Sequence, residues 1–212
     1  MKKIFAVLVA ASVSLLIQAQ TKQITLEDIW KKGTFSIKSV PGFNAKRNGT
    51  EYTQKDVADG KAQINLYDLA TGNKIKTLFD NGSQTVSGHP VKFENYEFNS
   101  DENKLLLFED GEYIYRRSAV YKVYVYDLGT NNIILLDKEK VLHASFSPDG
   151  SKVAFVKNNN LYYKDLKSNK TVQITTDGKR NEIINGNCDW VYEEEFEFTK
   201  AYQWSPDGKT IA

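Results

Sequence analysis

The chain has 212 residues, of which 41% are hydrophobic, 26% charged and 12% aromatic, and its formal net charge is +1. This composition is too apolar for a disordered chain, and the length is sufficient to bury a core. The near-zero charge argues against binding to nucleic acid or anionic lipid through bulk electrostatics. We therefore expect a globular protein that has no nucleic-acid partner.

The first 19 residues have the pattern of a signal peptide. Lys2 and Lys3 form a basic start, and residues 4–17 (IFAVLVAASVSLLI) carry no charge. This run is too short to span a bilayer comfortably, and the small Ala19 suits a cleavage site. An N-terminal membrane anchor is the alternative. We expect residues 1–19 to be removed and the mature protein to be exported to the periplasm, the cell surface or the medium, without a membrane span.

After a segment at residues 20–40, the chain repeats one pattern three times. Each copy has an apolar stretch that ends in Asp-Leu, then a turn rich in Gly, Asn and Ser, then a second stretch. This pattern predicts a β-hairpin. The copies are INLYDLATGNKIKTL from Ile64, VYVYDLGTNNIILL from Val123 and LYYKDLKSNKTVQIT from Leu161.

A second repeated unit alternates with these hairpins. Its Ser-Pro-Asp-Gly core predicts a tight turn between strands, because Pro fixes φ and Gly tolerates positive φ. The copies are FNSDENKLLLF from Phe98, FSPDGSKVAFV from Phe146 and WSPDGKTIA from Trp204.

Together the two units indicate about four strands in every ~40 to 50 residues, the period of a β-propeller blade. We predict an all-β fold in which residues 41–212 form an incomplete β-propeller, with a further degenerate blade at residues 42–57. An irregular β-sandwich is the alternative. Because the chain stops at Ala212 within an expected strand, we interpret it as the N-terminal part of a longer protein.

Residues 189–198 read DWVYEEEFEF, with three consecutive glutamates between aromatic residues. Asp189 is a typical N-cap residue and predicts a short helix that carries the glutamates. Negative charge held against apolar side chains suggests a site for a cation. The alternative is a solvated helix face, which is the usual interpretation of an acidic run.

The remaining reactive side chains suggest no site. Cys188 is the single cysteine, so no internal disulfide forms, and neither His89 nor His143 has the context of a thiol protease. No Cys or His spacing indicates a metal site, and we expect no cofactor. The sequence also lacks the Gly-x-Ser-x-Gly motif of a serine nucleophile, so we expect the chain alone to be catalytically inactive.

The acidic motif resembles the propeller domain of dipeptidyl peptidase IV, a member of the prolyl oligopeptidase group of serine peptidases. The resemblance includes Asn-Gly at 185–186, Asp-Trp-Val-Tyr-Glu-Glu-Glu at 189–195 and Trp-Ser-Pro-Asp-Gly at 204–208. It extends to Thr-Leu-Glu-Asp at 25–28 and Tyr-Arg-Arg-Ser at 115–118, and thus covers most of the mature chain. The sequence looks like an exported bacterial member of the family.

The resemblance implies a role for three residues. Glu194 and Glu195 would bind the free α-ammonium of a peptide substrate, and Arg116 would bind the carbonyl of its penultimate position. Arg117 is the alternative to Arg116, and we interpret Glu193 as structural.

The resemblance also implies that the catalytic Ser, Asp and His lie in a C-terminal α/β-hydrolase domain that this chain does not contain. The full-length enzyme would release dipeptides from free N-termini with Pro or Ala at the second position, and would be a homodimer. The alternative function is that of a non-enzymatic, TolB-like periplasmic propeller that binds a protein partner.

Overall fold

The computed structural model describes residues 23–37 and 42–212. The chain divides into two compact units, Met1–Pro41 and Gly42–Ala212, and each is described by itself. The expected signal peptide, residues 1–19, lies outside the described residues. Within the described ranges, no helix has the length and apolar character needed to cross a membrane.

The first unit contains one short helix within residues 23–37, α2 (Leu26–Trp30). It begins at Thr25, whose hydroxyl accepts a hydrogen bond from the backbone N–H of Asp28 at 3.2 Å. The Asp28 carboxylate in turn accepts one from the backbone N–H of Thr25 at 3.1 Å. This reciprocal pair satisfies N–H groups that the first helical turn leaves without a partner.

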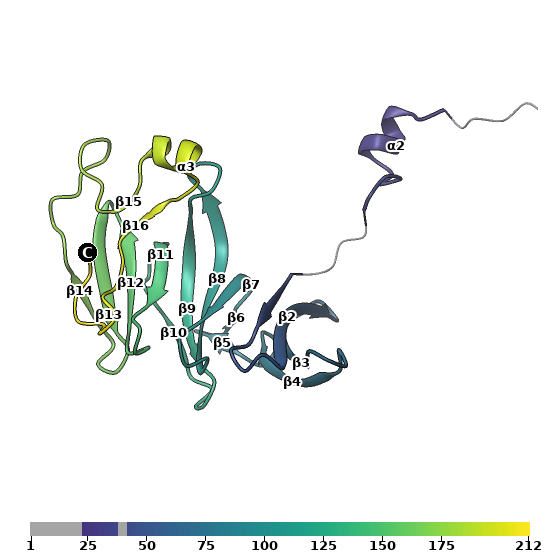
Figure 1. Ribbon diagram of the computed structural model, residues 1–212, viewed down its shortest axis with the longest axis horizontal. Coiled ribbons are helices and arrows are strands. Elements are labelled where there is room, and N and C mark those ends of the chain that lie inside the picture. Colours follow the sequence, from purple (N-terminus) through teal and green to yellow (C-terminus); the bar gives the residue numbers. More distant parts are fainter. Residues whose placement is uncertain (1–22, 38–41) are drawn as a thin grey trace, which may run out of the picture. The chain divides into compact units, whose positions relative to one another are not determined.

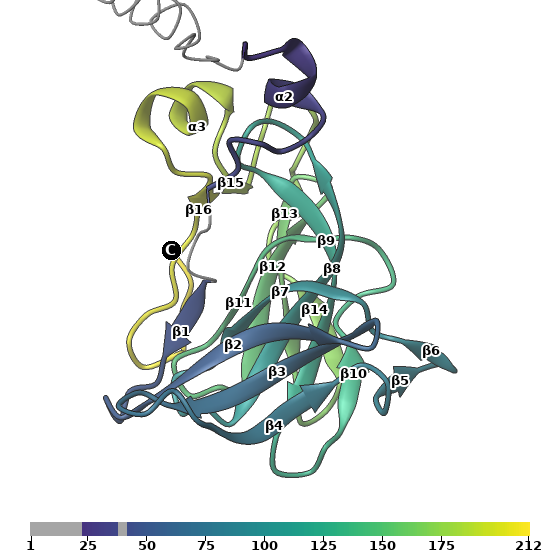
Figure 2. The same cartoon turned by 90° about the vertical axis from the view of Figure 1, so that its right-hand side faces the viewer.

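Three four-stranded antiparallel sheets make up most of the second unit (Figures 1 and 2). Sheet 1 contains β1 (Phe43–Ala45), β2 (Glu51–Ala58), β3 (Lys61–Asp68) and β4 (Lys74–Asp80). Sheet 2 contains β7 (Phe93–Phe98), β8 (Lys104–Tyr113), β9 (Ala119–Asp127) and β10 (Ile133–Leu135). Sheet 3 contains β11 (Leu142–Phe146), β12 (Lys152–Lys157), β13 (Asn160–Asp165) and β14 (Lys170–Gln173).

In each sheet, strands that follow one another in the chain are hydrogen-bonded neighbours, as in a propeller blade. Two shorter pairs accompany the sheets, and among residues 42–212 no sheet closes into a ring. The shorter pairs are β5 (Thr85–Val86) with β6 (His89–Pro90), and β15 (Gly186–Asn187) with β16 (Lys200–Ala201).

The repeated Asp-Leu pairs lie at the ends of β3, β9 and β13, which confirms the predicted hairpins. In each turn the aspartate carboxylate accepts a hydrogen bond from the backbone N–H three residues later, a local bond that favours the turn. The pairs are Asp68 with Thr71 (2.8 Å), Asp127 with Thr130 (2.9 Å) and Asp165 with Ser168 (2.7 Å).

The Ser-Pro-Asp-Gly turn between β11 and β12 is also confirmed. The Ser147 hydroxyl donates a hydrogen bond to the Asp149 carboxylate. Gly150 has a φ of +63°, in the region that glycine adopts without steric cost. The later copy at residues 205–208 has the same contacts, with a Ser205 to Asp207 bond of 2.6 Å.

Residues 42–57, which the sequence suggested as a separate degenerate blade, instead form β1 and β2 of sheet 1. β2 pairs along its whole length with β3, and the two strands meet at a two-residue turn of Asp59 (φ +52°) and Gly60 (φ +73°). This Asp-Gly turn contains neither of the two repeated patterns. The repeated patterns therefore did not indicate that β1 and β2 belong to the same sheet as β3 and β4.

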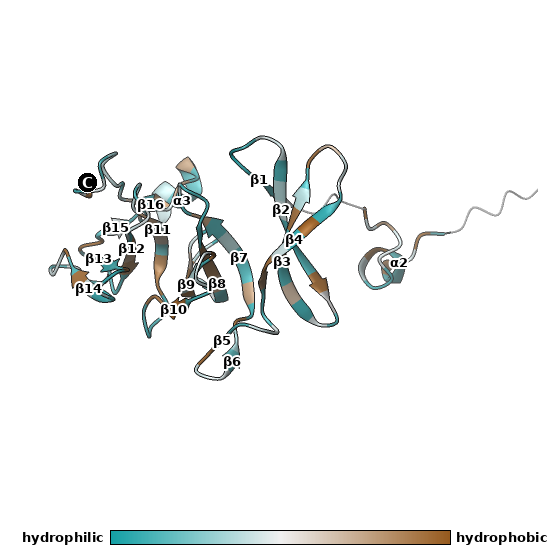
Figure 3. Ribbon diagram, turned by 90° about the horizontal axis from the view of Figure 1, so that it is seen from below, coloured by the Kyte–Doolittle hydropathy of each residue, from teal (hydrophilic) through white to brown (hydrophobic). Residues whose placement is uncertain are grey.

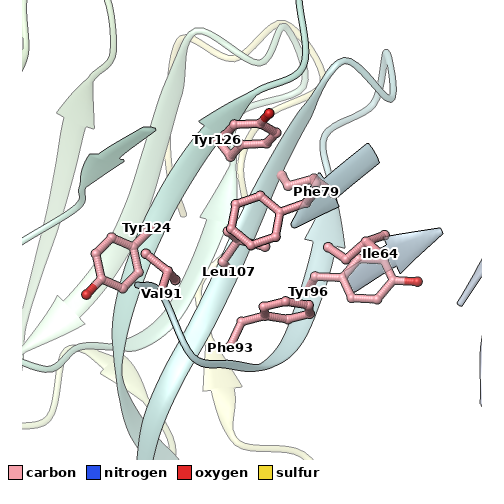
Figure 4. Packing of buried hydrophobic residues seen from close by; sticks show 9 residues of the cluster. Ile64, Phe79, Val91, Phe93, Tyr96, Leu107, Tyr124 and Tyr126 are labelled. Carbon is pink, nitrogen blue, oxygen red and sulfur yellow. The ribbon is translucent and has the colours of Figure 1, made fainter. Parts of the chain in front are cut away.

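The sheets pack face to face because β8, β9 and β12 carry buried apolar side chains on both faces. Leu107 of β8 packs with Ile64 and Phe79 of sheet 1 (Figure 4), whereas the preceding residue, Leu106, packs with Phe155 of sheet 3. Alternate side chains of a strand point to opposite faces, so one strand can join two interfaces. Apolar residues are accordingly frequent on β8, β9 and β12 (Figure 3).

The last described residues begin a fourth packing layer. Tyr202 and Trp204 pack against Ala154 and Val156 on the outer face of sheet 3. Trp204 also forms an isolated antiparallel bridge with Ile211. The segment between sheet 3 and this layer contains the acidic motif.

Candidate functional site

The acidic motif forms a seven-residue helix, α3 (Trp190–Phe196). The carboxylate of Asp189 accepts a hydrogen bond from the backbone N–H of Tyr192 at 3.1 Å, which confirms the predicted N-cap. The helix ends at Glu197, whose backbone is left-handed (φ 61°, ψ 22°). This turn reverses the chain directly after the glutamates, and the chain returns as β16.

The end of the β8–β9 hairpin, residues 110–119, contacts α3 and is named the arm (Figure 1). The register of the two strands shifts between Glu109 and Glu112, so a bulge separates the arm from the sheet. At the bulge a Cβ on Gly111 would lie 2.5 Å from a ring carbon of Tyr121, so any larger residue would force this ring to move.

A loop at the tip of the arm carries the Tyr-Arg-Arg-Ser segment. The backbone N–H of Ile114 donates to the carbonyl of Ser118 at 2.8 Å and closes the loop. Arg116 lies within it, with 72% of its side chain exposed. The loop therefore presents an arginine to solvent at a defined place next to α3.

Glu193 joins the arm to α3 through a buried carboxylate that is 2% exposed. Its Oε1 accepts hydrogen bonds from the backbone N–H groups of Arg117 and Ser118, the latter at 2.9 Å. Its Oε2 accepts one from the hydroxyl of Ser118 at 2.6 Å. Burial raises the pKa of this carboxyl group, but the bonds from Ser118 and Arg117 outweigh burial, so its pKa lies below the ordinary value.

The structure brings Arg116 and Glu194 together, although they are far apart in the sequence. Arg116 Nη1 lies 3.5 Å from Glu194 Oε2, and 16% of the Glu194 side chain is exposed. Glu195, on the next position of the helix, is exposed and forms no ion pair with any described residue. The site therefore contains one carboxylate that already has a cationic partner beside one that is open to solvent.

The second arginine of the segment has a different partner. Arg117 Nη2 lies 2.9 Å from Glu197 Oε1, after the end of α3. Glu193, Glu194 and Glu197 contact the arm. Together with Glu195 and the two arginines, these residues leave an excess of two negative charges. A cationic ligand would reduce the repulsion that this excess causes.

The aromatic residues of the motif do not enclose the glutamates. Trp190 is 52% exposed and Tyr192 47% exposed, although burial is the usual preference of such side chains. Tyr192 contacts the rings of Phe196 and Phe198, with ring centroids 5.5 Å apart in both pairs. The sequence predicted that the glutamates lie against buried aromatic side chains. Instead Tyr192, Phe196 and Phe198 form an exposed aromatic cluster at α3.

Ser118 and Glu197 belong to the site but were not identified as candidates from the sequence. Ser118 is the last residue of the Tyr-Arg-Arg-Ser segment, and Glu197 follows the acidic run after one aromatic residue. Their places next to the predicted residues were the available signal. Their roles depend on contacts between the two segments, which the sequence does not display.

The surroundings of His143 and Cys188 fit a structural role rather than a reactive one. The Nε2 atom of His143 lies 2.7 Å from Oδ1 of Asn187 in β15, and burial lowers the pKa of this histidine. Burial, followed by the charge of Asp189, raises the pKa of the Cys188 thiol, which makes it a weak nucleophile. No group of three or more His, Cys, Asp or Glu side chains within 23–37 and 42–212 could hold a metal ion.

Residues 99–212 match the family model described as the dipeptidyl peptidase IV N-terminal region. The chain belongs to the dipeptidyl peptidase IV family. This finding confirms the resemblance inferred from the acidic motif. The family consists of serine peptidases that act on peptides.

Other members of the dipeptidyl peptidase IV family are similar over most of the chain. Human prolyl endopeptidase FAP is 35% identical over 194 residues, which cover 90% of this chain and 24% of that protein. Dipeptidyl-aminopeptidase B of Aspergillus niger is 30% identical over 206 residues, covering 90% and 22%. The chain thus spans about a quarter of the length of these relatives.

A solved structure of the family has the same fold. The crystal structure of Porphyromonas gingivalis dipeptidyl peptidase 4 aligns with a TM-score of 0.79 and 37% identity, and the match covers 90% of this chain and 27% of that one. The three sheets therefore correspond to blades of the N-terminal β-propeller region of dipeptidyl peptidase IV.

Proposed function

We propose that this chain is the N-terminal substrate-recognition part of an exported serine dipeptidyl peptidase. In this proposal Glu194 and Glu195 bind the α-ammonium of a peptide substrate, and Arg116 binds the carbonyl of its penultimate position. The observation that carries the proposal is the 3.5 Å ion pair between Arg116 and Glu194, beside the open carboxylate of Glu195.

The chemistry of a peptide N-terminus fits this arrangement. An α-amine with a pKa of about 7.7 to 8.0 is mostly protonated at neutral pH and offers three N–H donors. Glu194 and Glu195 are neighbours on α3, and side chains of neighbouring helical residues diverge by ~100°. A small ammonium group between them can still donate to both, and such charge-assisted bonds are stronger than neutral ones.

Arg116 has two functions in this proposal. Without substrate it is the counter-ion of Glu194, which reduces the repulsion between the two carboxylates. With substrate bound, the ammonium supplies positive charge to the glutamates, and the exposed guanidinium is then available to donate to a carbonyl. A peptide with an acylated N-terminus supplies no charge, so the site rejects it.

The remaining steps belong to the part of the family's proteins that this chain does not span. In this proposal the catalytic Ser, Asp and His lie in a C-terminal α/β-hydrolase domain, and the chain alone is inactive. The full-length enzyme releases Xaa-Pro and Xaa-Ala dipeptides, forms a homodimer and is located in the periplasm, on the cell surface or in the medium. The family assignment favours this function over a non-enzymatic TolB-like propeller.

The test is substitution of the two glutamates in the full-length enzyme. Glu194→Gln and Glu195→Gln should each lower kcat/KM for a free-N-terminus Xaa-Pro substrate by ~10²- to 10³-fold, which corresponds to ~3 to 4 kcal/mol of lost transition-state stabilisation. Glu182→Gln is the matched control, because Glu182 is an exposed carboxylate with its own partner, Lys179, at 2.6 Å. It should leave kcat/KM unchanged.

A second measurement separates recognition from folding. A small covalent inhibitor that lacks an amine should still react with the active serine in both variants, since it does not use the glutamates. If both variants cleave the Xaa-Pro substrate at the wild-type rate, the proposal is wrong and the glutamates form a solvated helix face.

A further inference from the structure

We propose that Ser118 and Glu193 are positioning residues, whose hydrogen bonds fix Arg116 relative to Glu194 and so set the affinity of the site for substrate. This inference rests on the proposed function. Neither residue reaches the substrate in this proposal, because each side chain is 2% exposed.

The chain geometry connects Glu193 to Arg116. Glu193 accepts the backbone N–H of Arg117, and this N–H lies in the peptide plane that immediately follows the Cα of Arg116. The adjacent N–H and the hydroxyl of Ser118 bind the same carboxylate. Three bonds to one buried anion therefore fix the orientation of two successive peptide planes at the tip of the arm.

The same carboxylate fixes the other partner. Glu193 immediately precedes Glu194 on α3, so the place of its Cα determines where the Glu194 side chain begins. Arg116 thus lies one position before Arg117, which binds Glu193, and Glu194 lies one position after Glu193 itself. The Glu193 hydrogen bonds therefore fix both ends of the Arg116–Glu194 pair.

The two ion pairs between these segments cannot provide this rigidity. In the pair of Arg116 with Glu194 the arginine side chain is 72% exposed, and in the pair of Arg117 with Glu197 the exposed fractions are 38% and 72%. Exposed ion pairs contribute little, because solvent screens them and long side chains lose entropy. The bonds of Ser118 and Glu193 exclude water and have a fixed geometry.

Ser118→Ala in the full-length enzyme removes one of the three bonds and leaves Oε2 of Glu193 buried without its donor. We expect a ~10-fold lower kcat/KM for a free-N-terminus Xaa-Pro peptide, mostly through a higher KM. Glu193→Gln is the conservative variant, because its amide oxygen can still accept both N–H groups and its amide nitrogen can donate to the Ser118 hydroxyl. It should stay within ~3-fold of wild type.

A matched control loses a similar hydroxyl elsewhere. Thr53 is fully buried, and its hydroxyl accepts a hydrogen bond from the hydroxyl of Tyr96 at 2.9 Å across the contact between sheets 1 and 2. Thr53→Ala should lower stability, but it removes no hydrogen bond of Ser118 or Glu193, so KM should be unchanged. An equal increase of KM in Thr53→Ala and Ser118→Ala would mean that general destabilisation is the cause.

A double-mutant cycle with Arg116 decides between positioning and a merely structural role. If Ser118 acts by placing Arg116, then Ser118→Ala should cost less than ~2-fold in kcat/KM once Arg116→Met has removed the guanidinium. A loss that is equally large in both backgrounds overturns the inference. If Arg116→Met and Glu194→Gln themselves leave kcat/KM unchanged, the proposed function fails, which is a distinguishable result.

Discussion

The β8–β9 and β12–β13 hairpins are the central strand pairs of neighbouring sheets, yet they end in different ways. The β12–β13 strands pair without a break up to a two-residue turn of Asn158 and Asn159, with φ values of +50° and +58°. The β8–β9 strands shift register at a bulge and continue into the arm. The β12–β13 hairpin ends by local turn geometry, whereas the end of the β8–β9 hairpin depends on a contact with α3.

The difference shows how a repeated fold acquires a site. Both hairpins have apolar residues at the base, where the sheets pack. The arm extends beyond this core, and its residue Tyr113 is 71% exposed. Its tip is held by the bonds of Glu193 instead, so the two arginines in its loop lie beside the glutamates.

Truncation of a core residue at the base of a hairpin should have the largest effect on stability. Phe155 in β12 is fully buried, and Phe155→Ala should lower the free energy of unfolding by about 3 to 5 kcal/mol through lost burial and a cavity. The arm should behave differently, since Tyr113→Ala should change it by less than about 0.5 kcal/mol. Urea denaturation of the full-length protein measures both values. Comparable losses at the two positions would show that the arm belongs to the core.

Removal of the Glu193 carboxylate should detach the arm and leave the other hairpin intact. Glu193→Ala removes three hydrogen bonds, and we expect the free energy of local opening at the arm to fall by about 2 to 3 kcal/mol. Amide hydrogen exchange should then be ~10²-fold faster at Ser118 but unchanged in β12 and β13. Uniformly faster exchange in both hairpins would contradict a local role for Glu193.

The parts of the fold that sequence predicts are those with local causes. The Asp-Leu and Ser-Pro-Asp-Gly turns depend on hydrogen bonds between residues a few positions apart, such as Asp68 with Thr71. The N-cap of α3 is equally local, since Asp189 binds Tyr192. These contacts join residues a few positions apart, so a repeated local pattern identifies them.

The parts that sequence did not predict depend on distant segments. The bond between Ser118 and Glu193 joins residues 75 positions apart, and neither position has a pattern that names its partner. The family resemblance nominated Arg116 and Glu194, but their distance and the ion pair of Arg117 with Glu197 came from the structure.

The exposure of the aromatic cluster on α3 was not predicted either. Composition suggests that aromatic residues prefer burial, but the face of a helix that they occupy depends on which side chain is directed inward. Here Glu193 takes the buried position, because its hydrogen bonds to the arm compensate for its desolvation.

The stability of the turn between β12 and β13 should depend on backbone conformation rather than on side-chain contacts. Asn158 has a positive φ, and a β-branched residue is strongly disfavoured there. Asn158→Val should therefore lower the free energy of unfolding by about 1 to 2 kcal/mol, whereas Asn158→Gly should be close to neutral. Thermal unfolding of the two variants measures the difference. Equal melting temperatures would show that the side chain, not the backbone, controls this turn.

At acid pH, protonation of Glu193 should weaken the attachment of the tip of the arm, and Glu193→Gln should abolish this pH dependence. The pKa of this carboxyl is below its ordinary value of 4.5, because the bonds of Ser118 and Arg117 outweigh burial. A group with a lowered folded pKa stabilises the folded state above its unfolded pKa, and this contribution is lost as pH falls through the folded pKa.

Protection of the Ser118 N–H, corrected for intrinsic exchange, should therefore be constant near neutral pH and should decrease below pH 4.5. The turn after β11 provides the comparison. There the Asp149 carboxylate accepts the backbone N–H of Ser151 at 3.1 Å and has its pKa lowered to about 2, chiefly by hydrogen bonds from Ser147 and Ser151. In Glu193→Gln the acid dependence should disappear at Ser118 and persist at Ser151. A decrease at Ser118 that survives this substitution would mean that another carboxylate attaches the arm.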